Sequence, residues 1–216
     1  MKKLLQLTAM LLALLPLTAC GVSSKPIEGR VVDTETKKPI AGAIVIARWD
    51  GTYSALVDSH TVCYHVETAT TDQDGRYKIP GWWEKPKGPF FGEGPMYLDA
   101  YKPGYEKYWP AGYDRTEDFK NNVLYLAPFK GTKEERLKYL GRQITGTRCS
   151  AAGDKYKNLY PMYRAIYEES KSVSKSYMEI VWFRRQAAEA AVATGDHVSG
   201  DEMEKRVDEF LKDNLQ

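Results

Sequence analysis

Apolar and polar residues alternate in short runs through roughly the first half of the chain, as they do in the strands of a half-buried sheet. The first two strands are expected at 27–31 and 43–49, on either side of a polar turn. The inward face of the second strand would be formed by Ala43, Val45, Ala47 and Trp49. Its outward face carries Ile44 and Ile46, which is unusual for a strand with one face in water. We therefore expect another part of the chain to cover that face.

The same kind of pattern predicts five further strands. They are expected at 61–71, 76–79, 96–101, 105–109 and 123–127. In the first of these, strict alternation places Cys63, His65 and Glu67 together on one face. The opposite, core-facing side would be formed by Val62, Tyr64 and Val66.

Two irregular segments interrupt these strands. Residues 50–60 are expected to form a polar connection. The segment 80–95 contains four prolines, four glycines and four aromatic residues, so we expect neither helix nor strand there. Its rings are those of Trp82, Trp83, Phe90 and Phe91. Long loops of this kind are usually functional or disordered. We expect the rings to fold back and plug the end of the sheets; the alternative is an exposed platform that binds carbohydrate.

Four motifs follow one another in order between Pro26 and Pro128. They are Gly29-Arg30-Val31-Val32-Asp33, Pro39-Ile40-Ala41-Gly42-Ala43-Ile44-Val45, Thr71-Asp72-Gln73-Asp74-Gly75-Arg76-Tyr77 and Lys102-Pro103-Gly104-Tyr105. Together they resemble the carboxypeptidase regulatory-like domain, which is a transthyretin-like seven-stranded β-sandwich. The resemblance implies a non-catalytic module at 27–128 that packs against, or presents, something else. The chain departs from the family in a long insert between Asp50 and His60 and in the loop after Ile79, so function does not transfer directly.

From Phe129 onward the apolar residues recur at helical spacing. A capping box at 132–135 begins a first helix, and a long helix is expected at 161–194. A second capping box at 199–202 begins the last helix. The fold class expected for the chain is therefore α+β, a sandwich followed by a helical segment at 129–216.

The N-terminus has the pattern of an export signal. Lys2 and Lys3 precede the apolar run Leu4–Leu17, which is too short to span a membrane. The sequence Leu17-Thr18-Ala19-Cys20 resembles a bacterial lipobox, in which the new N-terminal cysteine carries lipid, including palmitate. We expect residues 1–19 to be a lipoprotein signal peptide, and 20–26 to be a tether that begins with a lipidated Cys20. The alternatives are an ordinary signal peptide with an incidental Cys20, or a short core helix.

The resemblance to lipoproteins also implies an address. Gly21, rather than aspartate, follows the cysteine, which favours the outer membrane of a Gram-negative cell, on the side facing the periplasm. Without Lys2 and Lys3 the 31 basic side chains become 29, which equals the 29 acidic ones. A neutral chain without a basic stripe is not typical of nucleic-acid binding, and we expect no nucleic-acid partner.

Two cysteines, Cys63 and Cys149, follow Cys20. In an oxidising compartment such a pair most simply forms a disulfide bond. Two buried thiols or a pair of metal ligands are the alternatives. A disulfide would hold the helical segment against the outer side of the sheets, over Ile44 and Ile46.

Candidate chemistry is weak. His60, Cys63, His65 and Glu67 are potential metal ligands, but a disulfide and a solvated polar face explain them better, so no metal is expected. Ser172-Val173-Ser174-Lys175 fits the S-x-x-K pattern of acyl-enzymes, yet it falls in the middle of an expected helix. Asp72-Gln73-Asp74-Gly75 lacks the remaining ligands of a calcium loop and is expected to be a turn.

No hydrolase, phosphate-binding or dinucleotide motif occurs, and none of His60, His65 and His197 has a glutamate three residues later. We therefore expect no catalytic residues and no cofactor. The expected function is that of a non-catalytic, lipid-anchored envelope protein that binds a protein partner or has a structural role. Aromatic residues of the long helix would anchor the partner, and they are Tyr160, Tyr163, Tyr167, Trp182 and Phe183. The alternatives are a lipoprotein that binds carbohydrate or peptidoglycan through loop 80–95, and an immunity-type periplasmic protein.

Overall fold

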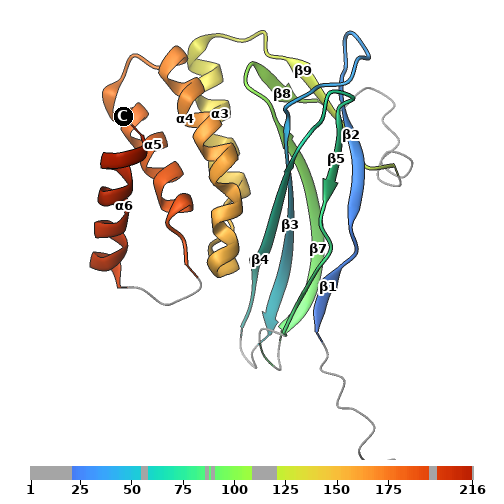
Figure 1. Cartoon of the computed structure of the whole chain (residues 1–216), viewed down its shortest axis with the longest axis vertical. Coiled ribbons are helices and arrows are strands. Elements are labelled where there is room, and N and C mark those ends of the chain that lie inside the picture. Colours follow the sequence, from blue (N-terminus) through green and yellow to red (C-terminus); the bar gives the residue numbers. More distant parts are fainter. Residues whose placement is uncertain are drawn as a thin grey trace, which may run out of the picture.

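The computed structural model of the chain describes residues 21–54, 58–85, 88, 91–108, 121–194 and 199–215. Cys20, Phe90 and His197, which the sequence singles out, lie outside these ranges. The fold is α+β, as expected, with the strands and the helices in separate layers (Figure 1).

The strands of the described ranges form two main sheets and one small sheet. They are β1 (Val22–Ser24), β2 (Ile27–Asp33), β3 (Ile44–Ser54), β4 (Ser59–Thr70), β5 (Arg76–Ile79), β6 (Trp82–Glu84), β7 (Phe91–Tyr101), β8 (Tyr105–Lys107) and β9 (Val123–Pro128). The orders are β5-β2-β9-β8 in the four-stranded sheet, β4-β3-β7 in the three-stranded sheet and β1-β6 in the small one. Neighbours are antiparallel except β2 and β9, which are parallel.

An apolar core lies between the two main sheets. Val31 and Leu126 of the four-stranded sheet meet Val45 and Ala47 of the three-stranded sheet, and all four side chains are buried. Burial of this kind contributes about 25 cal/mol for each Å² of apolar surface removed from water. The expected inward face of β3 is therefore confirmed, and the strands form a β-sandwich.

The helices cover the outer face of the three-stranded sheet (Figure 1). They are α3 (Lys133–Thr147), the 3₁₀ helix η1 (Ser150–Leu159), α4 (Tyr160–Val173), α5 (Tyr177–Ala191) and α6 (Gly200–Asn214). Ile44 and Ile46 belong to the same buried cluster as Leu140, Ile166 and Phe183 of the helices. The prediction that another part of the chain covers these two isoleucines is confirmed.

Both predicted capping boxes begin helices. The Thr132 hydroxyl accepts a hydrogen bond from the backbone N–H of Glu135, and the Glu135 carboxylate accepts one from the N–H of Thr132. At α6, the Ser199 hydroxyl accepts from the N–H of Glu202. Each cap satisfies backbone donors that the first turn of a helix leaves without a partner.

The single long helix predicted at 161–194 is wrong, because the chain breaks between α4 and α5. Ser174 has an extended backbone (ψ 143°), and Ser176 caps α5 by accepting from the N–H of Glu179. Serine hydroxyls compete with the helix for backbone hydrogen bonds, and the Ser174 hydroxyl accepts from the N–H of Ser176. The break allows α5 to turn back and pack beside α4.

The predicted polar connection at 50–60 is also wrong. β3 continues to Ser54 and β4 begins at Ser59, because the two strands remain paired as a long hairpin. The segment 80–95 likewise contains strands, since β6 pairs with β1 and β7 begins at Phe91. Contacts between rings stabilise these additions, and Tyr53 packs on both His60 and Phe91.

Strict alternation fails within β4, where Tyr64 is an extra residue. Trp49 of β3 pairs with His65, whereas the next residue, Asp50, pairs with Cys63. Such a bulge changes the face on which the following side chains lie. Cys63 packs against the helix-side cluster, whereas His65 lies against Trp49 in the core of the sandwich. The prediction that Cys63 and His65 share one face is therefore wrong.

Candidate functional site

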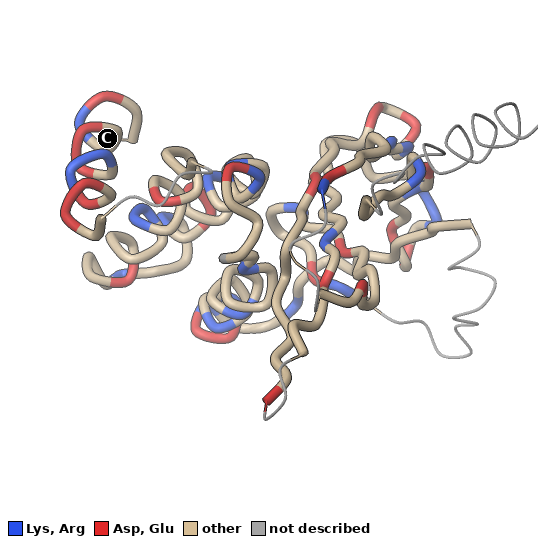
Figure 2. The backbone as a smooth tube through the Cα atoms, turned by 90° about the horizontal axis from the view of Figure 1, so that it is seen from below, with Lys and Arg blue, Asp and Glu red and all other residues tan. Residues whose placement is uncertain are grey.

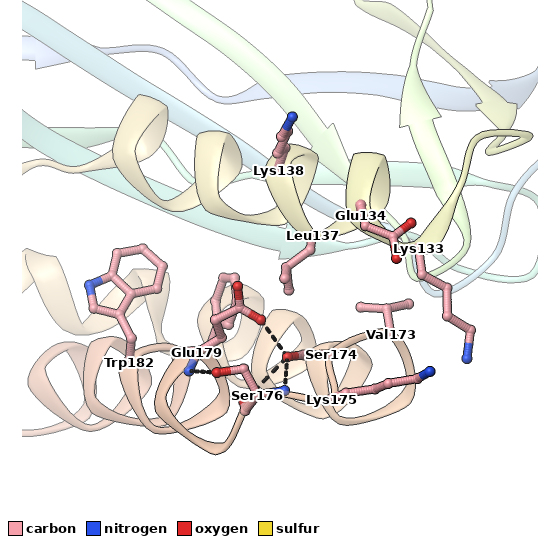
Figure 3. Close-up of a pocket in the computed structure, with 11 residues that line it drawn as sticks. Lys133, Glu134, Leu137, Lys138, Val173, Ser174, Lys175, Ser176, Glu179 and Trp182 are labelled. Carbon is pink, nitrogen blue, oxygen red and sulfur yellow. Dashed lines mark hydrogen bonds between the residues drawn. The ribbon is translucent and has the colours of Figure 1, made fainter.

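A hollow of about 650 Å³ opens on the helical layer, between α3 and the junction of α4 with α5 (Figure 3). Its apolar lining comes from Leu137, Val173, Trp182 and Phe183. In Figure 3, Leu137 extends from α3 towards α4 and α5, Trp182 lies at one end, and Lys133 and Lys175 lie at the other. We call this feature the α3–α5 groove.

The break between α4 and α5 creates the groove. Because the backbone leaves the helix at Ser174, α4 ends at Val173 and the side chain of Leu137 on α3 lies opposite the gap. The break has a defined geometry, since the Ser174 hydroxyl donates to the carboxylate of Glu179 (2.6 Å) while Ser176 caps α5. The apolar floor is therefore built by the fold and stays open to solvent.

One end of the groove carries two lysines, Lys133 and Lys175, beside the carboxylate of Glu134. The Lys133 ammonium donates to the backbone carbonyl of Ser172 (3.2 Å), and Lys175 is exposed in the break itself. The pKa of Glu134 is lowered by a hydrogen bond from its own backbone N–H, then by Thr132, with Lys175 and Lys133 adding to the effect. Figure 2 shows basic and acidic residues interspersed over the described chain.

The first two turns of α5 extend the apolar surface beyond the groove. Tyr177 is 75% exposed, Met178 is 73% exposed and Trp182 is 39% exposed. The Trp182 ring packs edge-on against Phe183, which is buried (4.9 Å between ring centroids). Aromatic and methionine side chains that are exposed together are typical anchors of protein interfaces.

Of the five helix aromatics predicted to anchor a partner, Trp182 alone is exposed. Tyr163, Tyr167 and Phe183 are buried in the helix-side core, and Tyr160 packs against Phe210 of α6. Tyr177 and Met178 were not among the predicted anchors. The sequence predicted one unbroken helix, in which positions 177 and 178 lie in the middle. The break instead makes them the first turn of a new helix, α5, where they are exposed.

A buried ion pair that the sequence analysis missed lies beneath α3. Arg136 is 3% exposed, and its guanidinium makes two hydrogen bonds to the carboxylate of Glu169 on α4, at 2.8 and 2.9 Å. The hydroxyl of Tyr101 donates to the same carboxylate (2.5 Å). Arg136 also packs between the rings of Phe129 and Tyr139. This network joins α3, α4 and the sheet, so it holds the walls of the groove in place.

The aromatic loop does not form a binding platform in the described residues. Trp82 is stacked on His65 (3.7 Å between centroids) and packs edge-on against Trp49, while Phe91 packs against Tyr64. These rings therefore fill the end of the sandwich, as the first interpretation predicts. For Trp83 that interpretation is wrong, because its ring is 58% exposed.

The remaining candidates have structural partners. Cys63 and Cys149 form a disulfide bond with their Cα atoms 4.7 Å apart, which ties β4 to the segment before η1. His65 is buried between Glu84 (2.6 Å from Nδ1) and Glu67 (3.3 Å from Nε2). Across the described ranges, no group of three or more His, Cys, Asp and Glu residues is placed to hold a metal ion.

The other two motifs are local. Asp72 begins the predicted turn, since its carboxylate accepts from the N–H groups of Asp74 and Arg76 and Gly75 has φ +67°. Ser172 lies in the last turn of α4, where its hydroxyl donates to the carbonyl of Glu169.

Comparison with protein-family models, with curated proteins and with solved structures finds no match for the chain. Among the described helices, none has both the length and the apolar character needed to cross a bilayer. The functional argument therefore depends on the surfaces of the molecule itself.

Proposed function

We propose that the protein is a non-catalytic, lipid-anchored envelope protein that binds a protein partner through the α3–α5 groove. The observation that carries this proposal is the apolar hollow between Leu137, Val173 and Trp182, which continues into the exposed turn at Tyr177 and Met178. Contiguous apolar patches that are exposed on a protein surface mark interaction sites.

The shape and charge of the groove suggest the kind of partner. Its apolar floor and length suit one or two large apolar side chains of a helix or an extended segment. Lys133 and Lys175 at one end favour a carboxylate next to those anchors, because complementary charge fixes the orientation of binding. We infer an apolar segment with an acidic residue at one side.

The rest of the molecule serves as a base for this surface. On this proposal the sandwich at 27–128 is a transthyretin-like, carboxypeptidase regulatory-like domain; its four ordered motifs and its two packed sheets support that assignment. The proposed address is the periplasmic side of the outer membrane, with lipid on Cys20. The N-terminal pattern supports it, and a disulfide suits an oxidising compartment.

The test is affinity capture from envelope extracts with the full-length protein and two matched variants. Lys175→Glu reverses a charge at the groove, and Lys78→Glu makes the same change on β5, which lies in the sheet farther from the helices. We expect the native protein and Lys78→Glu to capture the same partner, and Lys175→Glu to lose most of it. A partner that Lys175→Glu retains at the native level, with Trp182→Ala also without effect, would contradict the groove as the binding surface.

A further inference from the structure

The exposed ring of Trp83 lies against the backbone of the residue that directly follows the proposed lipid-bearing cysteine. A Cβ atom added to Gly21 would be 2.0 Å from the indole Nε1 of Trp83, so the ring lies directly over this glycine. The pairing of β1 with β6 explains the contact, because Ser23 is opposite Trp83 and Val22 is opposite Glu84. The ring is nevertheless 58% exposed to solvent.

The strand that carries Trp83 is held firmly to the sandwich. On one side of Trp83, the ring of Trp82 is stacked on the buried His65. On the other side, the carboxylate of Glu84 bonds to Nδ1 of the same histidine at 2.6 Å. With both neighbours fixed in this way, the exposed indole has a defined position on the surface.

Trp83 and the α3–α5 groove are at opposite ends of the molecule. In Figure 1, β1, which pairs with the strand of Trp83, lies at the lower end. α3 begins, and α4 passes into α5, at the upper end (Figure 1). A surface that contacts the lower end would therefore leave the groove at the far end of the molecule.

We propose that Trp83 is a membrane-interface residue whose indole inserts among the lipid headgroups of the bilayer that anchors the chain. Tryptophan favours this zone because it combines an apolar ring with one polar N–H group. The occupant is a bilayer because the ring lies over Gly21, and Gly21 directly follows Cys20, the proposed site of lipid attachment. The contact sets the orientation of the molecule and presents the groove to the periplasm. This inference depends on the proposed lipid anchor.

The experiment uses the full-length lipidated protein in phosphatidylcholine vesicles, with bromine atoms on the lipid acyl chains near the headgroup. Brominated lipid quenches the fluorescence of tryptophan rings that lie in contact with it. The chain has five tryptophans, so native protein is compared with Trp83→Phe and with the control Trp182→Phe, which removes an exposed ring from the helical layer. We expect quenching in native protein and Trp182→Phe, and loss of most of it in Trp83→Phe.

Equal quenching of native protein and Trp83→Phe would overturn the proposal, as would loss of quenching in Trp182→Phe alone. Measuring the mass of the mature N-terminal peptide shows whether Cys20 carries lipid, so a wrong orientation can be told apart from a missing lipid anchor. A peptide without lipid on Cys20 overturns the anchor and the orientation together, whereas a lipidated peptide with no bromine-dependent quenching at Trp83 overturns the orientation only. Thermal melting of Trp83→Phe confirms that the variant is folded, and Trp83→Tyr, which also removes the indole at this position, provides a second variant.

Discussion

Arg136 and Glu169 form a two-point ion pair between α3 and α4, with side chains that are 3% and 10% exposed. Both groups have further partners: Glu169 also accepts from the hydroxyl of Tyr101 and from the N–H of Gly104, and Arg136 also donates to the carbonyl of Tyr105. The pair joins the two helices that form the walls of the groove to the sheet below. A buried pair of this kind specifies how elements pack, and its loss leaves one charge without a partner.

We predict that Glu169→Gln destabilises the protein by about 3–5 kcal/mol, since it leaves the Arg136 guanidinium buried without its counter-charge. Urea unfolding measures the free energy. The double variant Arg136→Met with Glu169→Leu should recover much of that loss, because it removes both charges. A single-variant cost of less than about 1 kcal/mol, as for an exposed pair, would contradict the account.

A second prediction concerns the disulfide bond between Cys63 and Cys149, which closes a loop with a sequence separation of 86 residues. In the chain-entropy model such a loop contributes on the order of 4–5 kcal/mol, and often less in practice. Cys63→Ser should therefore lower the melting temperature of oxidised protein, and reductant should have no further effect on that variant. If these cysteines give two free thiols in denatured, unreduced protein, the prediction is wrong.

The third prediction is that the protein loses stability in alkali. Burial raises the pKa of Tyr64 and of Tyr139 to about 12, and it raises the pKa of Tyr77, Tyr101 and Tyr163 further. In the unfolded chain these phenols titrate near pH 10. Between about pH 10 and 12 the unfolded state has lost protons that the folded state retains, so stability falls as the pH rises.

This stability is fully present below about pH 10 and decreases above it. The measurement is the melting temperature between pH 7 and 12, together with tyrosinate absorbance at constant temperature. We expect a group of tyrosines to ionise only as the protein unfolds. Ionisation of all 15 tyrosines near pH 10 in folded protein would show that the rings are not buried.

Much of the layer architecture could be predicted from local patterns. Ile44 and Ile46 give β3 two apolar faces, which requires a covering layer, and the helices supply it. The caps at Thr132 and Ser199 are hydrogen bonds between residues that are three positions apart, so the sequence pattern predicts them directly. The disulfide was predictable because only two cysteines follow Cys20.

The remaining features depend on contacts between distant segments. The bulge at Tyr64 is a property of how β4 pairs with β3, and alternation in one strand does not reveal it. The break at Ser174, by contrast, has a local cause in the hydroxyls of Ser174 and Ser176, but the apolar pattern continues on both sides of it without glycine or proline to mark the end of a helix. Arg136 and Glu169 are 33 residues apart and resemble ordinary surface charges in the sequence. The groove forms where α3, α4 and α5 pack together, so the sequence alone did not predict it.

The central claim is that the α3–α5 groove binds a partner, and site-specific photo-crosslinking in living cells tests it most directly. A photoreactive amino acid replaces Trp182, Lys175 or, as control, Lys78, one at a time in the full-length chain. The account predicts an adduct of the same mass from positions 182 and 175, with no such adduct from position 78. An adduct from position 78 with none from 182 and 175 would place the binding surface on the sandwich and contradict the account.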